Sequence, residues 1–377
     1  KTLEIDSGLL RSVSSNITYT NNIENSKKCN IYIVTVPTPI DEHNQPNLSP
    51  LIKASKSIGT VLNEGDIVIY ESTVYPGVTE EICAPVLEKS SNMIFNKNFF
   101  CGYSPERINP GDKTYTVANI VKVTSGSTKA AAKKIDELYK EVVSAGTYLT
   151  TSIRVAEASK VIENIQRDVN IALINEIAII FNKLGIDTNE VIEAAATKWN
   201  FIKLKPGLVG GHCISVDPYY LSFKAQEHGY HPDLILAARQ INNGMSKYIA
   251  DQTIKAMINS KKNIKNSSVL VLGITFKKDC PDMRNTKVID MIEELKTFGV
   301  LVDVYDPWVD NDNKNSFYEH GIITDPFKND KKYDAIIVAV DHTHFERYTD
   351  LNYRSLSNNE SVIIDVKGIV KNPTWRL

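Results

Sequence analysis

The chain has 377 residues, and its 43 basic and 45 acidic side chains leave a net charge of -2 at pH 7. This near balance gives no sign of a nucleic-acid or membrane partner, although it does not exclude a local phosphate site. An apolar content of 42% is that of an ordinary soluble globular protein, and the length predicts two or three domains.

The first region has the pattern of a largely parallel sheet wrapped by helices. Short β-branched runs, separated by helical or loop segments, occur at residues 31–36, 67–71, 99–103 and 120–123. The chain contains no GxGxxG turn, with which a dinucleotide-binding domain normally opens. Either the first βαβ unit is missing from this chain, or the region does not bind a dinucleotide in the usual way. We favour the first explanation.

A long helix is predicted from about Ser152 to Leu184, because apolar residues recur there at three- and four-residue spacing until Gly185. A helix of roughly 30 residues is about 45 Å long, so it would span more than one domain. A Gly/Pro-rich loop at residues 206–218 and a further helical stretch to about Ser260 follow it.

The α/β pattern returns in the last region. It predicts strands at residues 269–273, 302–305, 335–340 and 362–366, and a helix at residues 287–298. We therefore predict the α/β class, with domains at residues 1–150, 151–260 and 261–377, of which the middle one is helical.

The cysteines indicate a reducing compartment. There are five, an odd number, widely spaced and without a CxxC pair, which fits neither a disulfide framework nor a zinc ribbon. The first residues have no signal-peptide pattern, and the most apolar stretch, residues 171–181, is interrupted by Asn175 and Glu176. We expect a cytoplasmic protein without a membrane partner. The cysteines are Cys29, Cys83, Cys101, Cys213 and Cys280.

The loop at residues 206–218 is the densest chemical motif. Its three glycines let the backbone approach a ligand, Cys213 follows them, and Asp217 lies four residues later. This pattern is typical of a nucleophile on an anion-tolerant loop. An isolated cysteine is, however, more often a small buried hydrophobe, and a Gly-rich loop is more often a plain turn. The loop alone slightly favours the plainer interpretation.

The long helix carries a polar stripe made of Glu157, Lys160, Asn164 and Asp168. Each of these residues taken singly would be a solvated surface side chain. If the stripe is buried beside a substrate, Lys160 could accept a proton or stabilise an oxyanion. The helix alone does not decide between these alternatives.

Polar residues follow several predicted strands, at residues 36–39, 71–77 and 103–111. Open α/β sheets bind ligands at such strand ends, but ordinary turns use the same residue types. In the last region, Lys277, Lys278 and Arg284 precede a helix and could hold a diphosphate, or could form a solvated charge run.

The seven histidines show no metal-ligand spacing such as HxxxH or HExxH. We expect His342 and His344 to be exposed, and we predict no metal.

In this order, the motifs resemble those of the UDP-glucose/UDP-N-acetylhexosamine 6-dehydrogenase family. The resemblance runs along almost the whole chain and rests on VPTP, STVYPG, SPER, EASKVIEN, GGHC and TFKKD. It implies an N-terminal NAD-binding Rossmann-like domain, a central domain on a long dimer-forming helix, and a C-terminal Rossmann-like domain that binds UDP. Members begin with GxGxxG, so this chain departs from the family there and is expected to bind NAD poorly.

The resemblance also implies roles for individual residues. Cys213 would be the nucleophile, with Glu106 as general base and Thr73 holding a water or the oxyanion, and Lys160, Asn164 and Asp217 would surround the reacting C6. NAD would contact Val36, Thr38, Ser72, Thr73 and Arg284. The UDP-sugar would contact Glu106, Arg107, Lys160, Asn164, Lys205, Gly210, Gly211, Phe276, Lys277 and Lys367.

The implied reaction is a four-electron oxidation of a sugar CH2OH to a carboxylate, which consumes two NAD+. Residues 197–201 ahead of the glycine loop are similar to the bacterial branch that acts on UDP-N-acetylglucosamine or UDP-N-acetylgalactosamine for capsule or O-antigen synthesis. UDP-glucose and UDP-ManNAc are the alternative substrates. Two other functions stay open: a two-electron dehydrogenase that stops at a ketone and does not need Cys213, and a non-catalytic nucleotide-sugar-binding protein.

Overall fold

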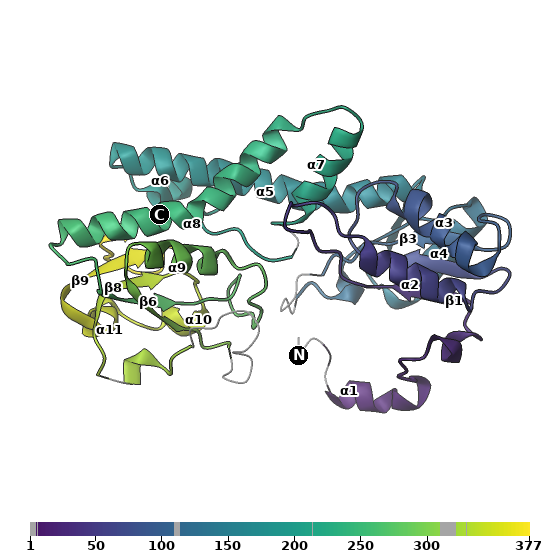
Figure 1. Cartoon of the computed structure of the whole chain (residues 1–377), viewed down its shortest axis with the longest axis horizontal. Helices are drawn as coiled ribbons and strands as arrows, with labels where there is room; N and C mark the ends of the chain where they lie inside the picture. Colours follow the sequence, from purple (N-terminus) through teal and green to yellow (C-terminus); the bar gives the residue numbers. More distant parts are fainter. Residues whose placement is uncertain (1–4, 6, 109–113, 213, 310–321, 329) are drawn as a thin grey trace. The chain divides into compact units, whose positions relative to one another are not determined.

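The computed structural model describes residues 5, 7–108, 114–212, 214–309, 322–328 and 330–377. The chain divides into two compact units. The first unit consists of Lys1–Ile165 and Val216–Pro232, and the second of Gln166–Ser215 and Asp233–Leu377. The longest helix, α5 (Ile153–Leu184), therefore contributes to both units. Figure 1 labels the main elements.

The first unit is built on a parallel sheet with the strand order β1 (Ile31–Val34), β2 (Ile67–Tyr70), β3 (Phe100–Tyr103). Side chains alternate along the fully buried strand β2. Val68 and Tyr70 join one core, and Ile67 and Ile69 join another. Strands that are buried on both faces appear in a sequence as continuous apolar runs, which explains why β2 was predictable.

Helices cover both faces of this sheet. The core around Val68 contains residues of α2 (Ser49–Gly59) and α3 (Ala84–Ser91), and the core around Ile67 contains residues of α4 (Lys129–Val142). Val216 and Tyr220 join the first of these cores, so the start of α7 (Asp217–Glu227) packs there together with the start of α5.

The second unit contains a five-stranded sheet in which all paired strands are parallel. Its order is β10 (Trp375–Arg376), β9 (Ser357–Asp365), β8 (Tyr333–Val338), β6 (Ser268–Leu272), β7 (Leu301–Tyr305). Residues of α8 (Asp233–Asn259) and α9 (Lys287–Thr297) share a core with Val269 and Val271. The opposite core contains Leu270 and Leu272 with residues of α10 (Thr343–Glu346) and α11 (Asp350–Ser355).

The strand order creates a switch point between β6 and β8. The chain leaves β6 toward β7 on one side, and the later strands β8, β9 and β10 lie on the other side. Ligands of open α/β sheets bind at such a point, beyond the carboxyl ends of the strands. The loops that begin at Gly273 and Ala339 meet there, because they follow β6 and β8.

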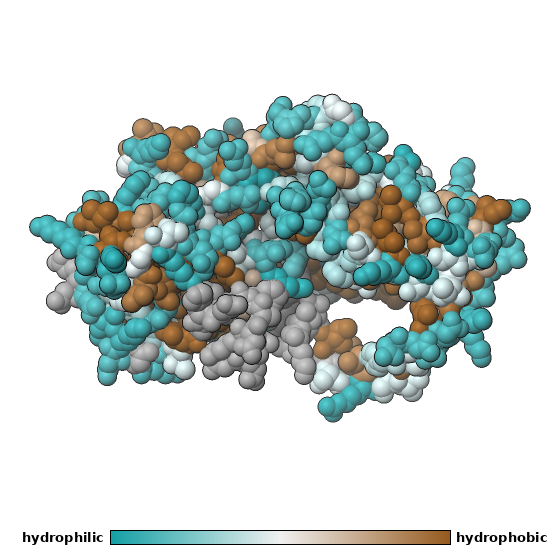
Figure 2. All heavy atoms as spheres, viewed as in Figure 1, coloured by the Kyte–Doolittle hydropathy of each residue, from teal (hydrophilic) through white to brown (hydrophobic). Residues whose placement is uncertain are grey.

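The remaining elements are short. The first unit also has a second parallel pair, β4 (Lys122–Thr124) with β5 (Thr147–Leu149), and the one-turn helix α1 has no buried residue. Figure 2 shows apolar as well as polar surface on the segment that carries α1. The other elements are α1 (Ser7–Ser12), η1 (Ser14–Asn16), η2 (Ile23–Ser26), the π-helix η3 (Val78–Cys83), η4 (Val117–Asn119), α6 (Thr188–Ala195) and η6 (Pro326–Lys328).

The predicted α/β class, with parallel sheets and a long central helix, is confirmed. The helix predicted to start at about Ser152 starts at Ile153 and ends at Leu184. Within the described residues, no helix is long and apolar enough to cross a membrane. The same residues contain no group of three or more His, Cys, Asp or Glu side chains that could hold a metal ion.

The structure corrects one prediction and decides one alternative. His342 and His344 were expected to be exposed, but His344 is half-buried and His342 is fully buried, since Asp306, far away in sequence, supplies a buried hydrogen-bond partner. The four residues of the polar stripe on α5 are also buried, so the solvated interpretation of Glu157, Lys160, Asn164 and Asp168 is wrong.

Candidate active site

A buried hydrogen bond links the polar stripe of α5 to α7. Glu157, Lys160 and Asn164 lie one turn apart on the helix and are at most 6% exposed. The amide nitrogen Nδ2 of Asn164 donates to Oδ2 of Asp217, the first residue of α7, at 2.5 Å. Because buried polar groups need partners, this contact fixes both side chains.

Asp217 is a buried carboxyl with an altered acidity. Burial raises its pKa to about 7, although the hydrogen bond from Asn164 and the charge of Lys160 both oppose the rise. A carboxyl with a pKa near 7 can take up and release a proton at neutral pH, which suits an acid-base role.

Glu106 lies in the turn after β3 and is half-buried. Burial raises its pKa, while the backbone N–H of Ile108 and the charges of Lys160 and Lys122 lower it. The charge of Lys160 therefore acts on both Glu106 and Asp217. We call Glu106, Lys160, Asn164 and Asp217 the α5 cluster, since the structure brings these four predicted residues together within the first unit.

Arg107 holds the turn of Glu106 against α5. Its Nη2 atom forms an ion pair with Glu163 at 2.7 Å, and its Nη1 atom donates to the carbonyl oxygen of Val121 at 2.7 Å. The guanidinium group is thus engaged by the protein itself. The sequence did not predict this pairing, and the substrate contact of Arg107 stays a prediction.

The four predicted cofactor residues of the first unit lie together at the carboxyl ends of β1 and β2. Ser72 Oγ donates to the carbonyl oxygen of Val36 at 2.6 Å, and Thr38 Oγ1 donates to that of Thr73 at 2.8 Å. Val36, Thr38 and Thr73 keep part of their surface exposed. Parallel sheets bind dinucleotides beyond the carboxyl ends of their strands, so the position of these residues fits a dinucleotide site.

Glu157 supports the loop that carries Ser72 and Thr73. Its carboxylate accepts the backbone N–H groups of Gly77 at 2.5 Å and Thr79 at 2.9 Å, where η3 begins. Burial raises its pKa to about 7 despite these hydrogen bonds. We did not assign Glu157 a role from the sequence, and its only signal was its spacing of three residues from Lys160.

In the second unit, two glycines of the loop at residues 206–218 pack closely on two residues that were predicted to bind the substrate. A Cβ atom on Gly211, which has a φ of +90°, would lie 2.8 Å from the ring of Phe276. A Cβ atom on Gly207 would lie 2.9 Å from Nζ of Lys367. Asn175 brackets Gly207, since its side chain accepts the N–H of Gly207 at 2.8 Å and donates to the carbonyl oxygen of Gly207 at 3.1 Å.

A pocket opens between this loop and the switch point of the sheet. The residues that line it surround about 250 Å³ of space that no atom fills, a figure that includes the open solvent in front of them. Ammonium groups and the amino end of α9 are suited to phosphate groups, and this lining provides both. We call it the switch-point pocket. It is lined by Leu208, Gly210, Thr275, Phe276, Lys277, Thr286, Lys287, Val288, Ala339, Val340 and Lys367.

Lys205 lies close enough to Lys367 for its charge to act on that lysine. Burial lowers the pKa of Lys367, Asp341 raises it, and Lys205 lowers it further. The predicted substrate residues Lys205, Gly210, Gly211, Phe276, Lys277 and Lys367 are therefore gathered in the second unit.

Arg284, the fifth predicted cofactor residue, comes from a different unit than the other four. It belongs to the second unit, is exposed, and its Nη2 atom pairs with Oδ2 of Asp282 at 2.7 Å. Burial would raise the pKa of Asp282, but His212 and Arg284 lower it. The NAD contact of Arg284 stays a prediction. The predicted nucleophile, Cys213, lies outside the described residues.

Comparisons with known proteins indicate one family along most of the chain. Models of the UDP-glucose/GDP-mannose dehydrogenase family match residues 5–143 (NAD binding domain), 154–244 (central domain) and 270–372 (UDP binding domain). A UDP-N-acetyl-D-glucosamine 6-dehydrogenase of Pseudomonas aeruginosa is 56% identical over 97% of this chain and 86% of that protein. Protein CapL of Staphylococcus aureus is 52% identical over 97% of this chain and 87% of that protein.

A solved structure has the same fold. A UDP-D-ManNAc dehydrogenase from Pyrococcus horikoshii superposes with a TM-score of 0.89 and 31% identity, over 99% of this chain and 87% of that one. The family-level prediction and the NAD cofactor are thereby confirmed, and a non-catalytic binding protein is disfavoured. This chain belongs to the UDP-glucose/GDP-mannose dehydrogenase family and is an NAD-dependent nucleotide-sugar dehydrogenase.

Proposed function

We propose that this protein oxidises the C6 hydroxymethyl group of a UDP-N-acetylhexosamine to a carboxylate. The observation that carries the proposal is the α5 cluster, in which one buried lysine acts on two carboxyls with raised pKa. The substrate class is supported by the relative from Pseudomonas aeruginosa, which is named for UDP-N-acetyl-D-glucosamine. The similarity to CapL supports a place in capsule precursor synthesis, and O-antigen precursor synthesis is the alternative.

The first half of the reaction takes the alcohol to an aldehyde. NAD+, when bound near Val36, Thr38, Ser72, Thr73 and Arg284, supplies the chemistry of hydride acceptance. The hydroxyl proton goes to Lys160 or to a water held by Asp217. A substrate oxygen near Lys160 and Asn164 would meet a cation and an amide donor, both buried, where electrostatic stabilisation is strong.

The second half takes the aldehyde to the acid through Cys213. The thiolate adds to the aldehyde carbon, and Lys160 and Asn164 stabilise the oxyanion of the resulting thiohemiacetal. Loss of a second hydride gives a thioester, which a water activated by Glu106 and oriented by Thr73 hydrolyses to the carboxylate and the free thiol. The four electrons reduce two NAD+, and covalent attachment keeps the aldehyde from escaping.

The UDP moiety is assigned to the switch-point pocket. Lys277 and Lys367 lie in its lining, and Lys205 is near Lys367. These cations complement a diphosphate, which keeps its negative charge through every step. Phe276, Gly210 and Gly211 supply the close apolar and backbone surface beside them, and Glu106 and Arg107 are proposed to contact the sugar.

The larger organisation is also part of the proposal. We propose domains at residues 1–150, 151–260 and 261–377, a cytoplasmic location, and a homodimer formed through α5. Four apolar side chains of α5 are about half exposed, at spacings of 7, 11 and 7 residues that keep them on one helix face. These side chains are Val155, Ile162, Leu173 and Ile180.

The test is NADH formation by the purified full-length enzyme with UDP-GlcNAc, UDP-GalNAc, UDP-ManNAc and UDP-glucose. We expect the highest rate with a UDP-N-acetylhexosamine, two NADH for each sugar consumed, and a carboxylate product. A highest rate with UDP-glucose would refute the substrate class. Full activity of Cys213→Ser, or one NADH per sugar with a ketone product, would refute the thioester route.

A further inference from the structure

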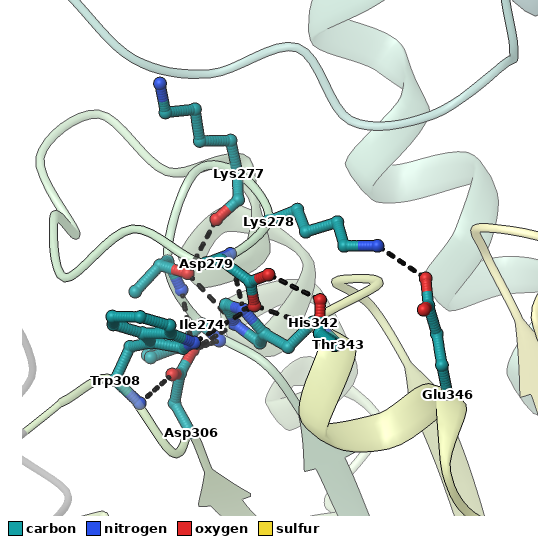
Figure 3. Close-up of polar contacts among 10 residues, drawn as sticks. Ile274, Lys277, Lys278, Asp279, Asp306, Trp308, His342, Thr343 and Glu346 are labelled. Atoms are coloured by element: carbon teal, nitrogen blue, oxygen red, sulfur yellow. Dashed lines mark hydrogen bonds and ion pairs between the residues drawn. The ribbon is translucent and has the colours of Figure 1, made fainter. Parts of the chain in front are cut away.

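A buried histidine joins the carboxyl ends of three strands in the second unit (Figure 3). His342 follows β8, and its Nε2 atom lies 3.0 Å from Oδ2 of Asp306, which follows β7, and 3.1 Å from Oγ1 of Thr275, which follows β6. On the other side of the ring, the backbone N–H of Asp279 donates to Nδ1 at 2.9 Å. One imidazole thus bridges the residues that surround the switch point.

These contacts define the protonation of the ring. An N–H group points at Nδ1, so this nitrogen carries the lone pair and the proton of a neutral imidazole lies on Nε2. The Nε2–H group then donates to the carboxylate of Asp306 and faces the hydroxyl oxygen of Thr275. The hydroxyl of Thr275 in turn donates to the carbonyl oxygen of Lys277 at 3.1 Å.

The histidine acts on a residue whose backbone is strained. Asp279 has a φ of +51°, in the left-handed region, which is uncommon for a residue with a side chain and persists only where neighbours hold it. Its carboxylate accepts Thr343 Oγ1 at 2.5 Å and Trp308 Nε1 at 3.1 Å. Asp279 is therefore held on its main chain by His342 and on its side chain by two further residues.

The segment fixed in this way carries two residues of the switch-point pocket. Phe276 and Lys277 lie between Thr275 and Asp279, and the side chain of Lys277 points away from the buried histidine in Figure 3. The ammonium group of Lys277 lies 5.5 Å from the centre of the Phe276 ring. A shift of the 275–279 backbone would move both side chains in the pocket.

We propose that His342, as the neutral Nε2–H tautomer, is a positioning residue that fixes the 275–279 backbone, so that Phe276 and Lys277 meet the diphosphate end of the nucleotide sugar. His342 does not itself line the pocket. The inference rests on the assignment of UDP to that pocket under the proposed function.

Two substitutions of His342 test the contacts of its two ring nitrogens separately. The side-chain oxygen of Asn can replace Nδ1 as the acceptor for Asp279, whereas the side-chain amide of Gln can replace Nε2–H as the donor to Asp306. We expect His342→Gln to weaken UDP binding about tenfold, since it loses the contact to the strained residue, and His342→Asn to weaken it at most about threefold. Calorimetry with UDP measures the affinity, and the KM of the UDP-sugar should rise with little change in kcat.

A surface variant keeps the test decisive if the buried variants do not fold. Thr343→Val removes the exposed hydroxyl that donates to Asp279, so it should weaken UDP binding by severalfold at an unchanged melting temperature. Glu346→Gln is the matched control, because it removes only the exposed pair with Lys278 on the same helix and loop. This control should bind UDP as the unmodified protein does.

The outcomes distinguish the assignment of UDP to the switch-point pocket from the positioning role of His342. Failure of the unmodified protein to bind UDP would overturn the assigned UDP site. Normal UDP binding by the unmodified protein together with unchanged affinity in folded His342→Gln and in Thr343→Val would overturn only the role of His342. Nitrogen-15 labelling of the histidines gives an independent readout, because the signal that His342→Gln removes should be that of an imidazole protonated on Nε2. A signal protonated on Nδ1 would contradict the proposal.

Discussion

Asp217 is the single residue whose protonation we expect to govern the rate near neutral pH. Burial raises its pKa to about 7, so it is protonated below this pH and ionised above it. If the ionised form holds the water that takes the hydroxyl proton, kcat falls as the pH drops below about 7. Asp217→Asn keeps an oxygen that can accept the hydrogen bond of Asn164 but cannot ionise.

We therefore expect Asp217→Asn to lower kcat about a hundredfold and to flatten the acidic limb of its pH profile. Steady-state NADH formation between pH 5.5 and pH 9 measures both effects. A variant whose pH profile keeps the same acidic limb would show that another group is responsible for it.

The buried site residues show which properties of single residues could not be predicted from the sequence. Lys160 and Asn164 could be named as site residues from a motif, but their burial depends on α7 and on the turn of Glu106, which the helix pattern does not contain. His342 was expected on the surface, since the histidines show no metal-ligand spacing. Its partner Asp306 is 36 residues away in the chain, so no local pattern could reveal the buried pair.

At the scale of elements, Glu157 joins α5 to the loop before η3. Its pKa of about 7 in the folded protein lies above its ordinary value, so the folded state holds this proton more tightly than the unfolded state does. The resulting stabilisation is fully present below the ordinary pKa of a glutamate and is lost as the pH rises through about 7. The ionised carboxylate remains hydrogen-bonded to Gly77 and Thr79.

Glu157→Gln should remove this pH dependence, because a side-chain amide does not titrate. Urea midpoints measured from pH 5 to pH 8 should fall less steeply in the variant than in the unmodified protein. Asp217 contributes a slope of the same sign, so Asp217→Asn is the matched comparison and the double variant should be the flattest. Equal slopes in all four proteins would contradict the raised pKa values.

Strand β4 is joined to the turn of Glu106 by Lys122. The ammonium group of Lys122 donates to the carbonyl oxygen of Pro105 at 3.1 Å and pairs with Glu71 at 3.2 Å, and Tyr139 donates to the same carboxylate. The charge of Lys122 also lowers the pKa of Glu106. The sequence offered no signal for the grouping of Lys122, Glu71 and Tyr139, since the three residues are far apart in the chain.

Lys122→Met should raise the pKa of Glu106 and slow the hydrolytic step that this residue is proposed to assist, by about tenfold at neutral pH. Rapid-quench detection of covalently bound sugar measures this step, and the bound fraction should increase. Lys122→Arg keeps the charge and should restore most of the rate. If Lys122→Arg is as slow as Lys122→Met, the effect is one of packing and not of charge.

The secondary structure was predictable where burial makes an apolar run or a helical period. The strands predicted at residues 67–71 and 269–273 appear as Ile67–Tyr70 and Ser268–Leu272, and α5 ends before Gly185 as expected. Strands β5 and β10 were not predicted, because three residues of partly exposed strand and two residues at the sheet edge carry no periodic signal.

For the whole molecule, the two units each contain one part of the predicted machinery. The α5 cluster and the loops after β1 and β2 belong to the first unit, and the switch-point pocket belongs to the second. Most of the motifs follow a predicted strand or lie on the long helix, whereas the loop at residues 206–218, which lines part of the pocket, follows neither kind of element directly. Their assembly around Cys213 is a proposal that depends on the proposed reaction.

The assembly of two chains through α5 is the prediction that belongs to this largest scale. Ile162 is 56% exposed and Leu173 is 52% exposed on the same helix face, so a second copy of α5 could cover both. One chain has a mass of 42.2 kDa, and light scattering should therefore give twice this mass for the unmodified protein. The double variant Ile162→Glu, Leu173→Glu places charges on the stripe and should give the single mass. Lys133→Glu changes an exposed residue of α4 and should leave the dimer intact. A dimeric mass that persists in the α5 variant would place the interface elsewhere.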